Sequence, residues 1–349
     1  FGNQALQKWD DKKAVARDPS ALEKYRSMLA EQIQYFKVTQ YFFFKQWTEL
    51  KNYANQKGIQ IIGDMPIYVA ADSVEVWTKP ELFQLDEERN PLFVAGVPAD
   101  QFSATGQLWG NPLYAWEEHK KQGYAWWIHR IEESFKIYDV LRIDHFKGFS
   151  DYWQVDGKAE VAKDGSWQPG PGYDLFKAVK EQLGDLPIIA EDLGNIDDKA
   201  RKLLADCNYP GMKILQFGFE DVSGESLDSP HYCIPHSIVY TGTHDNDVTN
   251  GWYNSLTEQQ QQYINDYTHR HEDESICQAM IRQLFATVSN TTIATMQDVL
   301  DLPASSRMNV PSTIGGNWQW RMQQSDLTQD KKDFLAKMTT LYQRANQEK

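Results

Sequence analysis

Four short apolar segments of the chain each end on an acidic residue. They are 60–64 (QIIGD), 140–144 (VLRID), 187–192 (PIIAED) and 237–245 (SIVYTGTHD). Apolar runs of this length, separated by helical patterns, are typical of buried strands in a parallel sheet. In an α/β barrel the carboxyl ends of the strands form the active-site face. Acidic residues from several strands would therefore meet in one cleft, as acid–base and covalent chemistry on a sugar requires.

Helical and strand patterns alternate along the rest of the chain. Helices are predicted near 18–36, 40–56, 114–138, 174–183, 197–207, 257–267, 274–289 and 329–344, and two further strands at 212–219 and 291–297. This makes six strands, whereas a closed (β/α)8 TIM barrel needs eight. Because no strand pattern precedes residue 58, we expect the first two barrel strands to lie upstream of Phe1 and to be missing from this chain. The predicted domain is an α/β catalytic barrel over 1–349 that lacks its N-terminal part.

The segment 65–138 is long for a single connection between strands. Its middle part, 91–112, is rich in Gly, Pro, Asn and aromatic residues and has no clear period. A long segment without regular structure inside a compact domain is usually a functional loop. We therefore expect an insertion at 65–138 whose 94–114 loop belongs to the active site.

Composition excludes several classes of partner. The formal net charge is −14 and no basic block occurs, which argues against nucleic acids and anionic membranes as partners. Three widely spaced cysteines form neither a disulfide framework nor a metal cluster, so a cytoplasmic location is expected. No apolar stretch is long enough to span a membrane, and we expect no signal peptide. Aromatic residues reach 13%, a surplus that suits stacking against sugar rings.

Two acidic residues stand out as catalytic candidates. Strand alternation puts Arg142 and Asp144 on the same face, and a nearby arginine favours the ionised carboxylate that a nucleophile needs. A purely structural ion pair is an equally good interpretation of that spacing. Glu191 ends an apolar strand, where burial and neighbouring acids raise a carboxyl pKa, as a general acid requires. Its alternative is a cap for the next helix, a role that fits Asp192 better.

The remaining candidates have weaker patterns. His244 and Asp245 follow a strand directly and suit hydrogen bonds to sugar hydroxyls. A metal site is disfavoured because no second ligand cluster has suitable spacing, and no cofactor is expected. Asp64 could be catalytic, but a role in holding the other acids in place is favoured.

The acidic segments lie within longer motifs: 63–69 (GDMPIYV), 96–114 (GVPADQFSATGQLWGNPLY), 142–148 (RIDHFKG), 190–194 (AEDLG), 240–247 (YTGTHDND), 307–311 (RMNVP) and 315–318 (GGNW). Together these closely resemble the motifs of 4-α-glucanotransferases (amylomaltases), glycoside hydrolase family 77 of the α-amylase clan. The resemblance spans nearly the whole chain. It numbers the four acid-ending strands three, four, five and seven of the barrel and places the 65–138 insertion between strands three and four.

The resemblance also implies roles for single residues. It implies that Asp144 is the nucleophile, that Glu191 is the acid/base and that Asp245 stabilises the transition state. The other residues that it places around the substrate are Arg142, His244, Asp64, Asp192, Phe102, Trp109 and Asn309. The implied partners are maltooligosaccharides, α-1,4-glucans and glucose.

The implied reaction is a retaining double displacement that transfers α-1,4-glucan segments through a covalent glycosyl-enzyme. One rival is an α-1,4-glucan hydrolase of the same clan, which the 97–107 motif disfavours. A rival from another class is a non-catalytic glucan-binding protein. It is disfavoured because binding alone does not require a nucleophile and an acid on adjacent strands.

Overall fold

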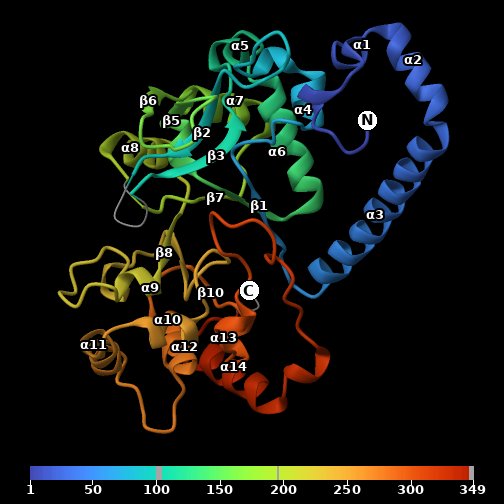
Figure 1. The fold of residues 1–349 in the computed structure, drawn as a ribbon. Coiled ribbons are helices and arrows are strands. Elements are labelled where there is room, and N and C mark those ends of the chain that lie inside the picture. Colours follow the sequence, from blue (N-terminus) through green and yellow to red (C-terminus); the bar gives the residue numbers. More distant parts are fainter. Residues whose placement is uncertain (100–103, 195, 346–349) are drawn as a thin grey trace. The chain divides into compact units, whose positions relative to one another are not determined.

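The computed structural model describes residues 1–99, 104–194 and 196–345 (Figure 1). The chain divides into two compact units, Phe1–Tyr209 and Pro210–Lys349, and each is described by itself. Both contain parallel strands alternating with helices, so the α/β class is confirmed. No helix among the described residues is long and apolar enough to cross a membrane.

The first unit is built on a parallel sheet with the order β1-β4-β7. Its strands are β1 (Ile62–Met65), β4 (Val140–Ile143) and β7 (Ile188–Ala190), which match three of the predicted strands. The register pairs Asp64 with Arg142, and Ile143 with both Met65 and Ala190. On β1, a side chain at Gly63 would overlap the ring of Tyr138, so only glycine allows this close packing.

A second, antiparallel sheet in this unit was not predicted. Its order is β3-β2-β5-β6, with β2 (Phe93–Val97), β3 (Gln107–Pro112), β5 (Asp151–Asp156) and β6 (Ser166–Pro169). The expectation that 91–112 has no regular structure is therefore wrong for its described residues. The strands are short, Gly or Pro occurs in β2, β3 and β6, and β2 is stabilised by pairing with β5, nearly sixty residues away. Local periodicity cannot reveal a strand that depends on such a distant partner.

The helices of the first unit differ from the predictions mainly at their ends. They are α1 (Lys12–Val15), α2 (Pro19–Met28), α3 (Ala30–Gln56), α4 (Val74–Thr78), α5 (Trp116–Lys121), α6 (Ala125–Ile137), α7 (Tyr173–Leu183) and α8 (Asp198–Cys207). Asp18 caps α2, because its side chain accepts the N–H groups of Ser20 and Ala21. The helix predicted at 114–138 is two helices, since Gly123 and Tyr124 adopt positive φ between α5 and α6.

Helix α3 is a single helix of 27 residues in which no residue is buried (Figure 1). The prediction divided this region near residue 40, whereas the break between α2 and α3 lies at Leu29. Large apolar side chains along α3 are exposed, among them Tyr35, Phe36, Tyr41 and Phe42. Hydrogen bonds near its C-terminal half, from Trp47 and Lys51 to carbonyl oxygens around the end of α6, attach it to the unit.

The second unit contains another parallel sheet, with the order β10-β9-β8. The strands are β8 (Gly211–Ile214), β9 (Ser237–Tyr240) and β10 (Thr291–Ile293). Two predicted strands are shorter than expected, because 212–219 continues as helix α9 and 291–297 as helix α13. The helices are α9 (Leu215–Gly218), α10 (Thr249–Ser255), α11 (Glu258–Thr268), α12 (Ile276–Ala286), α13 (Met296–Val299) and α14 (Gln329–Leu341).

All six predicted parallel strands are present, in two three-stranded sheets. The structure thus establishes a mixed α/β fold with parallel strands, while the closed eight-stranded barrel stays a prediction.

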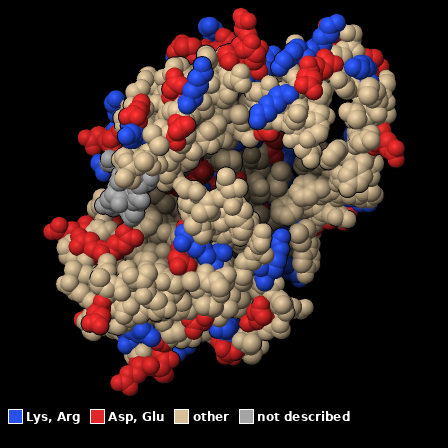
Figure 2. Space-filling view, viewed as in Figure 1, with Lys and Arg blue, Asp and Glu red and all other residues tan. Residues whose placement is uncertain are grey.

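Lys and Arg side chains lie interspersed with acidic ones on the face shown in Figure 2.

Candidate active site

The sheet of the first unit brings three of the predicted acids to one edge. Asp64 is on β1, and Asp144 and Glu191 directly follow β4 and β7. The Asp144 N–H donates to the carbonyl oxygen of Met65 at 3.0 Å, and the Glu191 N–H donates to that of Ile143 at 3.0 Å. The parallel register therefore continues to the catalytic candidates and fixes their backbone positions.

Arg142 joins two of these acids. Its Nη1 donates to both carboxylate oxygens of Asp64, at 2.6 and 2.8 Å, and lies 3.0 Å from Oδ1 of Asp144. The arginine is 7% exposed, and although its burial opposes charge, the nearby carboxylates raise its pKa above the ordinary value. A buried guanidinium thus holds the Asp144 carboxylate in place, as the predicted pairing on one strand face requires.

Glu191 is held by the backbone. Its Oε2 accepts the N–H of His145 at 2.8 Å, and its Oε1 accepts the N–H of Leu193 at 2.9 Å. Burial, followed by the charge of Asp144, raises the pKa of Glu191 to about 7, against the opposing effect of Arg142. A carboxyl of this kind can carry a proton near neutral pH and still ionise during a reaction.

The alternative roles of Glu191 and Asp192 as caps of the next helix are wrong. Helix α8 is capped by Asp197, whose Oδ1 accepts the N–H of Ala200 at 2.9 Å. Asp192 lies in the loop between Glu191 and this cap and is partly buried.

A buried lysine that sequence reasoning missed connects the segments after Asp144 and Glu191. Nζ of Lys147 donates to Asp151 at 2.5 Å and to Asp197 at 2.7 Å, and lies 4.4 Å from the ring centroid of Trp167. The hydrogen bond from Lys147 lowers the pKa of Asp197 to about 2, so this carboxylate remains ionised. The lysine stands in the 142–148 motif, but its partners belong to elements that could not be paired from sequence.

Aromatic residues lie beside the catalytic candidates. The ring of Trp109, on β3, meets the His145 ring edge-on at 4.9 Å and lies 6.3 Å from the Tyr68 ring. Burial lowers the pKa of His145 to about 4, so its ring is neutral at neutral pH. Trp109 itself is 37% exposed and can contact a ligand. Phe102, which the same motif predicts to lie at the substrate, is outside the described residues.

The second unit holds its own polar cluster after β9. Nδ2 of Asn309 donates to Oδ1 of Asp245 at 2.6 Å, and Nη2 of Arg307 donates to the Asp245 carbonyl oxygen at 2.6 Å. Nε2 of His244 lies 3.3 Å from Oδ2 of Asp245, and its ring lies 5.0 Å from that of Trp318. The structure thus brings together the predicted His244, Asp245 and Asn309. Arg307 and Trp318 had no assigned role, although both stand in the C-terminal motifs.

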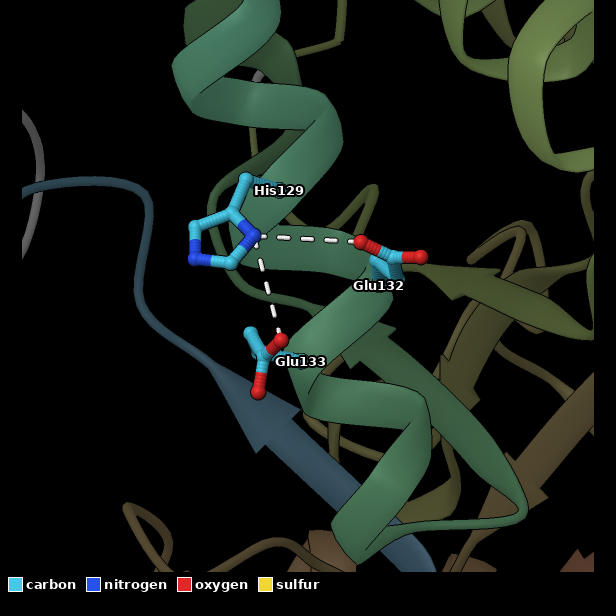
Figure 3. Close-up of side chains that lie close together, drawn as sticks. All are labelled: His129, Glu132 and Glu133. Atoms are coloured by element: carbon cyan, nitrogen blue, oxygen red, sulfur yellow. Dashed lines mark ion pairs between the residues drawn. The ribbon is translucent and has the colours of Figure 1, made fainter.

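One group of potential metal ligands lies outside both clusters. His129, Glu132 and Glu133 project from one exposed face of α6, with Nδ1 of His129 3.8 Å from an oxygen of each glutamate (Figure 3). Glu133 also pairs with Lys136. These contacts are those of a solvated helix face with i, i+3 and i, i+4 ion pairs.

Comparison with known proteins identifies the family. Residues 1–328 match the family model described as 4-alpha-glucanotransferase, of glycoside hydrolase family 77. The chain belongs to the 4-α-glucanotransferase family. It is thus an enzyme of the glycosyltransferase class that acts on α-1,4-glucans.

Similar proteins with the name 4-alpha-glucanotransferase support this assignment. A 4-alpha-glucanotransferase of Streptococcus pneumoniae is 52% identical over 348 residues, covering 99% of this chain and 69% of the relative. One from Clostridium butyricum is 43% identical, covering 94% and 68%.

Solved structures of amylomaltases are similar too. The amylomaltase from Streptococcus agalactiae in complex with acarbose is 60% identical, with a TM-score of 0.97, and the match covers 99% of this chain and 70% of that one. The amylomaltase from Corynebacterium glutamicum, at 16% identity and a TM-score of 0.62 over 78% and 44% of the chains, shares the fold.

Proposed function

We propose that the chain transfers α-1,4-glucan segments by a retaining double displacement in which Asp144 is the nucleophile and Glu191 the acid/base. The observation that carries this proposal is the contrast between two neighbouring carboxyls. The carboxylate of Asp144 lies 3.0 Å from the buried guanidinium of Arg142, and the carboxyl of Glu191 has a pKa raised to about 7. Such a difference in environment separates a nucleophile from a general acid.

The proposed chemistry has two steps. Glu191 gives its proton to the leaving glycosidic oxygen while Asp144 attacks the anomeric carbon, and a β-linked glycosyl-enzyme forms. Glu191, now ionised, takes the proton of the acceptor 4-hydroxyl as that oxygen displaces Asp144. Two inversions retain the α configuration. A retaining enzyme holds the two carboxyls about 5–5.5 Å apart, which a complex with a bound sugar would test.

The other candidate residues receive supporting roles in this proposal. Asp245, held by Asn309 and accompanied by His244, would stabilise the positive charge that develops on the sugar in the transition state. Asp64 would position Arg142, which it binds with both oxygens. Asp192, Trp109 and Phe102 would contact the glucan.

Three further proposals concern architecture, ligand and location. We propose that the six parallel strands are part of an eight-stranded barrel within one catalytic domain, with 65–138 as an insertion that carries the active-site loop. Acarbose, present in the relative from Streptococcus agalactiae, is the proposed competitive inhibitor. The free thiols of Cys207, Cys233 and Cys277 support a reducing, cytoplasmic location.

Transfer and hydrolysis are distinguished by counting reducing ends during incubation with maltotriose. Transfer to maltotriose or glucose conserves their number while longer and shorter products form, whereas an α-1,4-glucan hydrolase increases it. A glucan-binding protein would leave maltotriose unchanged. Either of these two results would contradict the proposed function.

The pH profile of transfer should follow the proton on Glu191. Because the pKa of this group is raised to about 7, the acid form that starts the reaction predominates below that pH. The value of kcat/KM should therefore fall tenfold per unit as pH rises above about 7. A fall that already begins near pH 5, where an ordinary glutamic acid ionises, would contradict the proposed role.

Trp109 is expected to shield the intermediate from water. Its ring packs against His145, the neighbour of Asp144, and is still exposed enough to contact a glucan. Trp109→Ala should raise the ratio of hydrolysis to transfer by about three- to tenfold. Tyr35→Ala, at an exposed aromatic residue of α3, is the control. An unchanged ratio in Trp109→Ala would remove this residue from the shielding role.

A further inference from the structure

A cavity of about 330 Å³ lies in the first unit along α7 and the C-terminal end of α8. Its volume is at the lower end of the range for small-molecule sites, which is about 300–1,000 Å³. Residues from α7 and from the segments that follow both helices form its wall, including Tyr173, Phe176, Lys180, Asp185 and Tyr209.

This cavity is separate from the catalytic candidates of the same sheet. Leu186, which lines it, precedes β7, whereas Glu191 follows β7. Five residue steps of extended chain separate the two positions, roughly 16 Å. The cavity therefore lies toward the opposite end of the strand from the acid, and a ligand can occupy it without reaching Asp144 or Glu191.

The floor of the cavity is aromatic. Phe176 is 2% exposed, and the Tyr209 ring meets it edge-on at a centroid distance of 5.7 Å. Tyr173 stands one helical turn before Phe176 and is 37% exposed, so its ring is accessible at the rim. The tyrosine rings offer an apolar face for the C–H groups of a sugar and a hydroxyl for its polar edge, while the buried Phe176 supports them from the core.

The charged groups at the rim are already paired. Lys180 Nζ lies 2.7 Å from Asp185 Oδ1, and Asp206 pairs with Lys202 at 2.7 Å. These ion pairs leave the rim close to neutral, with carboxylate oxygens and ammonium groups able to bond hydroxyls.

The helix ends at the cavity further limit the class of ligand. Helices α7 and α8 end at Leu183 and Cys207, and the residues that cap them, Gly184 and Asn208, line the cavity. Helix C-termini present carbonyl oxygens and a partial negative charge, which disfavour a phosphate and favour hydroxyl donors. A metal cation is disfavoured because an ammonium group already neutralises each rim carboxylate.

We propose that this cavity is an accessory binding site for an α-1,4-glucan, occupied by a short stretch of a long chain whose reacting end lies elsewhere. An aromatic floor and a neutral, hydrogen-bonding rim fit a sugar of no net charge. The choice of α-1,4-glucan as the sugar rests on the family activity. A second contact would retain long glucans and add nothing for a trisaccharide.

Affinity electrophoresis in native gels that contain amylopectin tests this site, alongside transfer assays with maltotriose. Tyr173→Ala should raise the apparent dissociation constant for amylopectin by about five- to tenfold. Lys180→Ala should weaken binding in the same direction. For both variants kcat/KM with maltotriose should stay within about twofold of the unaltered protein, since no catalytic group is touched. Tyr53→Ala, at an exposed tyrosine of α3, is the matched control and should change neither quantity.

The site is overturned if Tyr173→Ala and Lys180→Ala are both retarded by amylopectin as strongly as the unaltered protein. It is equally overturned if Tyr53→Ala loses as much affinity as they do. Absence of maltotriose transfer in the unaltered protein would speak against the proposed function instead, so the two failures are distinguishable.

Discussion

Replacing Asp144 by Asn should lower the rate of glucan transfer by about 10⁴-fold or more. The amide keeps the size of the side chain but cannot attack the anomeric carbon, so no glycosyl-enzyme forms. The measurement is the release of glucose and the formation of longer chains from maltotriose, together with mass spectrometry of the protein after rapid quenching. The unaltered protein should show the mass of a bound glycosyl group, and Asp144→Asn should not.

A matched control separates chemistry from a general loss of charge. Asp174→Asn alters an exposed aspartate on α7 that pairs with Lys120, and it should retain full activity. The pKa of Glu191 provides a second readout. Burial remains in Asp144→Asn, but the neighbouring charge that helps raise this pKa is removed, so the pKa should fall below about 7. Transfer by Asp144→Asn at the unaltered rate would end the covalent mechanism.

Replacing Glu191 by Gln should lower transfer from maltotriose by about 10³- to 10⁴-fold, since the leaving oxygen then departs without a proton. A substrate with a better leaving group distinguishes this defect from loss of the nucleophile. Fluoride leaves α-maltosyl fluoride without needing a general acid. Glu191→Gln should therefore still form the glycosyl-enzyme from this substrate, measured as released fluoride, whereas Asp144→Asn should not.

Glu181→Gln, at an exposed glutamate of α7 that pairs with Lys177, is the control for this change and should leave both substrates unaffected. If Glu191→Gln lost activity equally with maltotriose and with α-maltosyl fluoride, Glu191 would not be the acid. Its role would then be to hold the backbone of His145 and Leu193, whose N–H groups donate to the Glu191 oxygens.

The parallel strands could be predicted because their signal is local. Four of the six are apolar runs that end on an acid. β4, β7 and β9 lie within the predicted runs, and β1 extends one residue beyond its run, to Met65. The antiparallel sheet could not be predicted in this way, because β2 contains Gly96 and pairs with β5, nearly sixty residues away along the chain. The ends of β8 and β10 were misplaced since the apolar pattern continues into α9 and α13, where a strand and a short helix look alike.

The residues of the candidate site that could be predicted from sequence are those that lie at the ends of predicted strands or directly after them. The pairing of Arg142 with Asp144 follows from alternation along β4. Other contacts of the site depend on strand register and on the paths of loops. They are the contact of Arg142 with Asp64, the hydrogen bond from Lys147 to Asp197, and the packing of Trp109 against His145. No periodicity encodes those, so only the structure reveals them.

The hydrogen bonds that hold Glu191 come from main-chain N–H groups, and this has an evolutionary consequence. Substitution of side chains cannot remove those donors, so the direction of the carboxyl is insulated from most mutations. Its proton affinity depends on burial and on charges such as those of Asp144 and Arg142. Substitutions near the rim of the site can therefore shift the pH at which such an enzyme works, while the orientation of the Glu191 carboxyl stays the same.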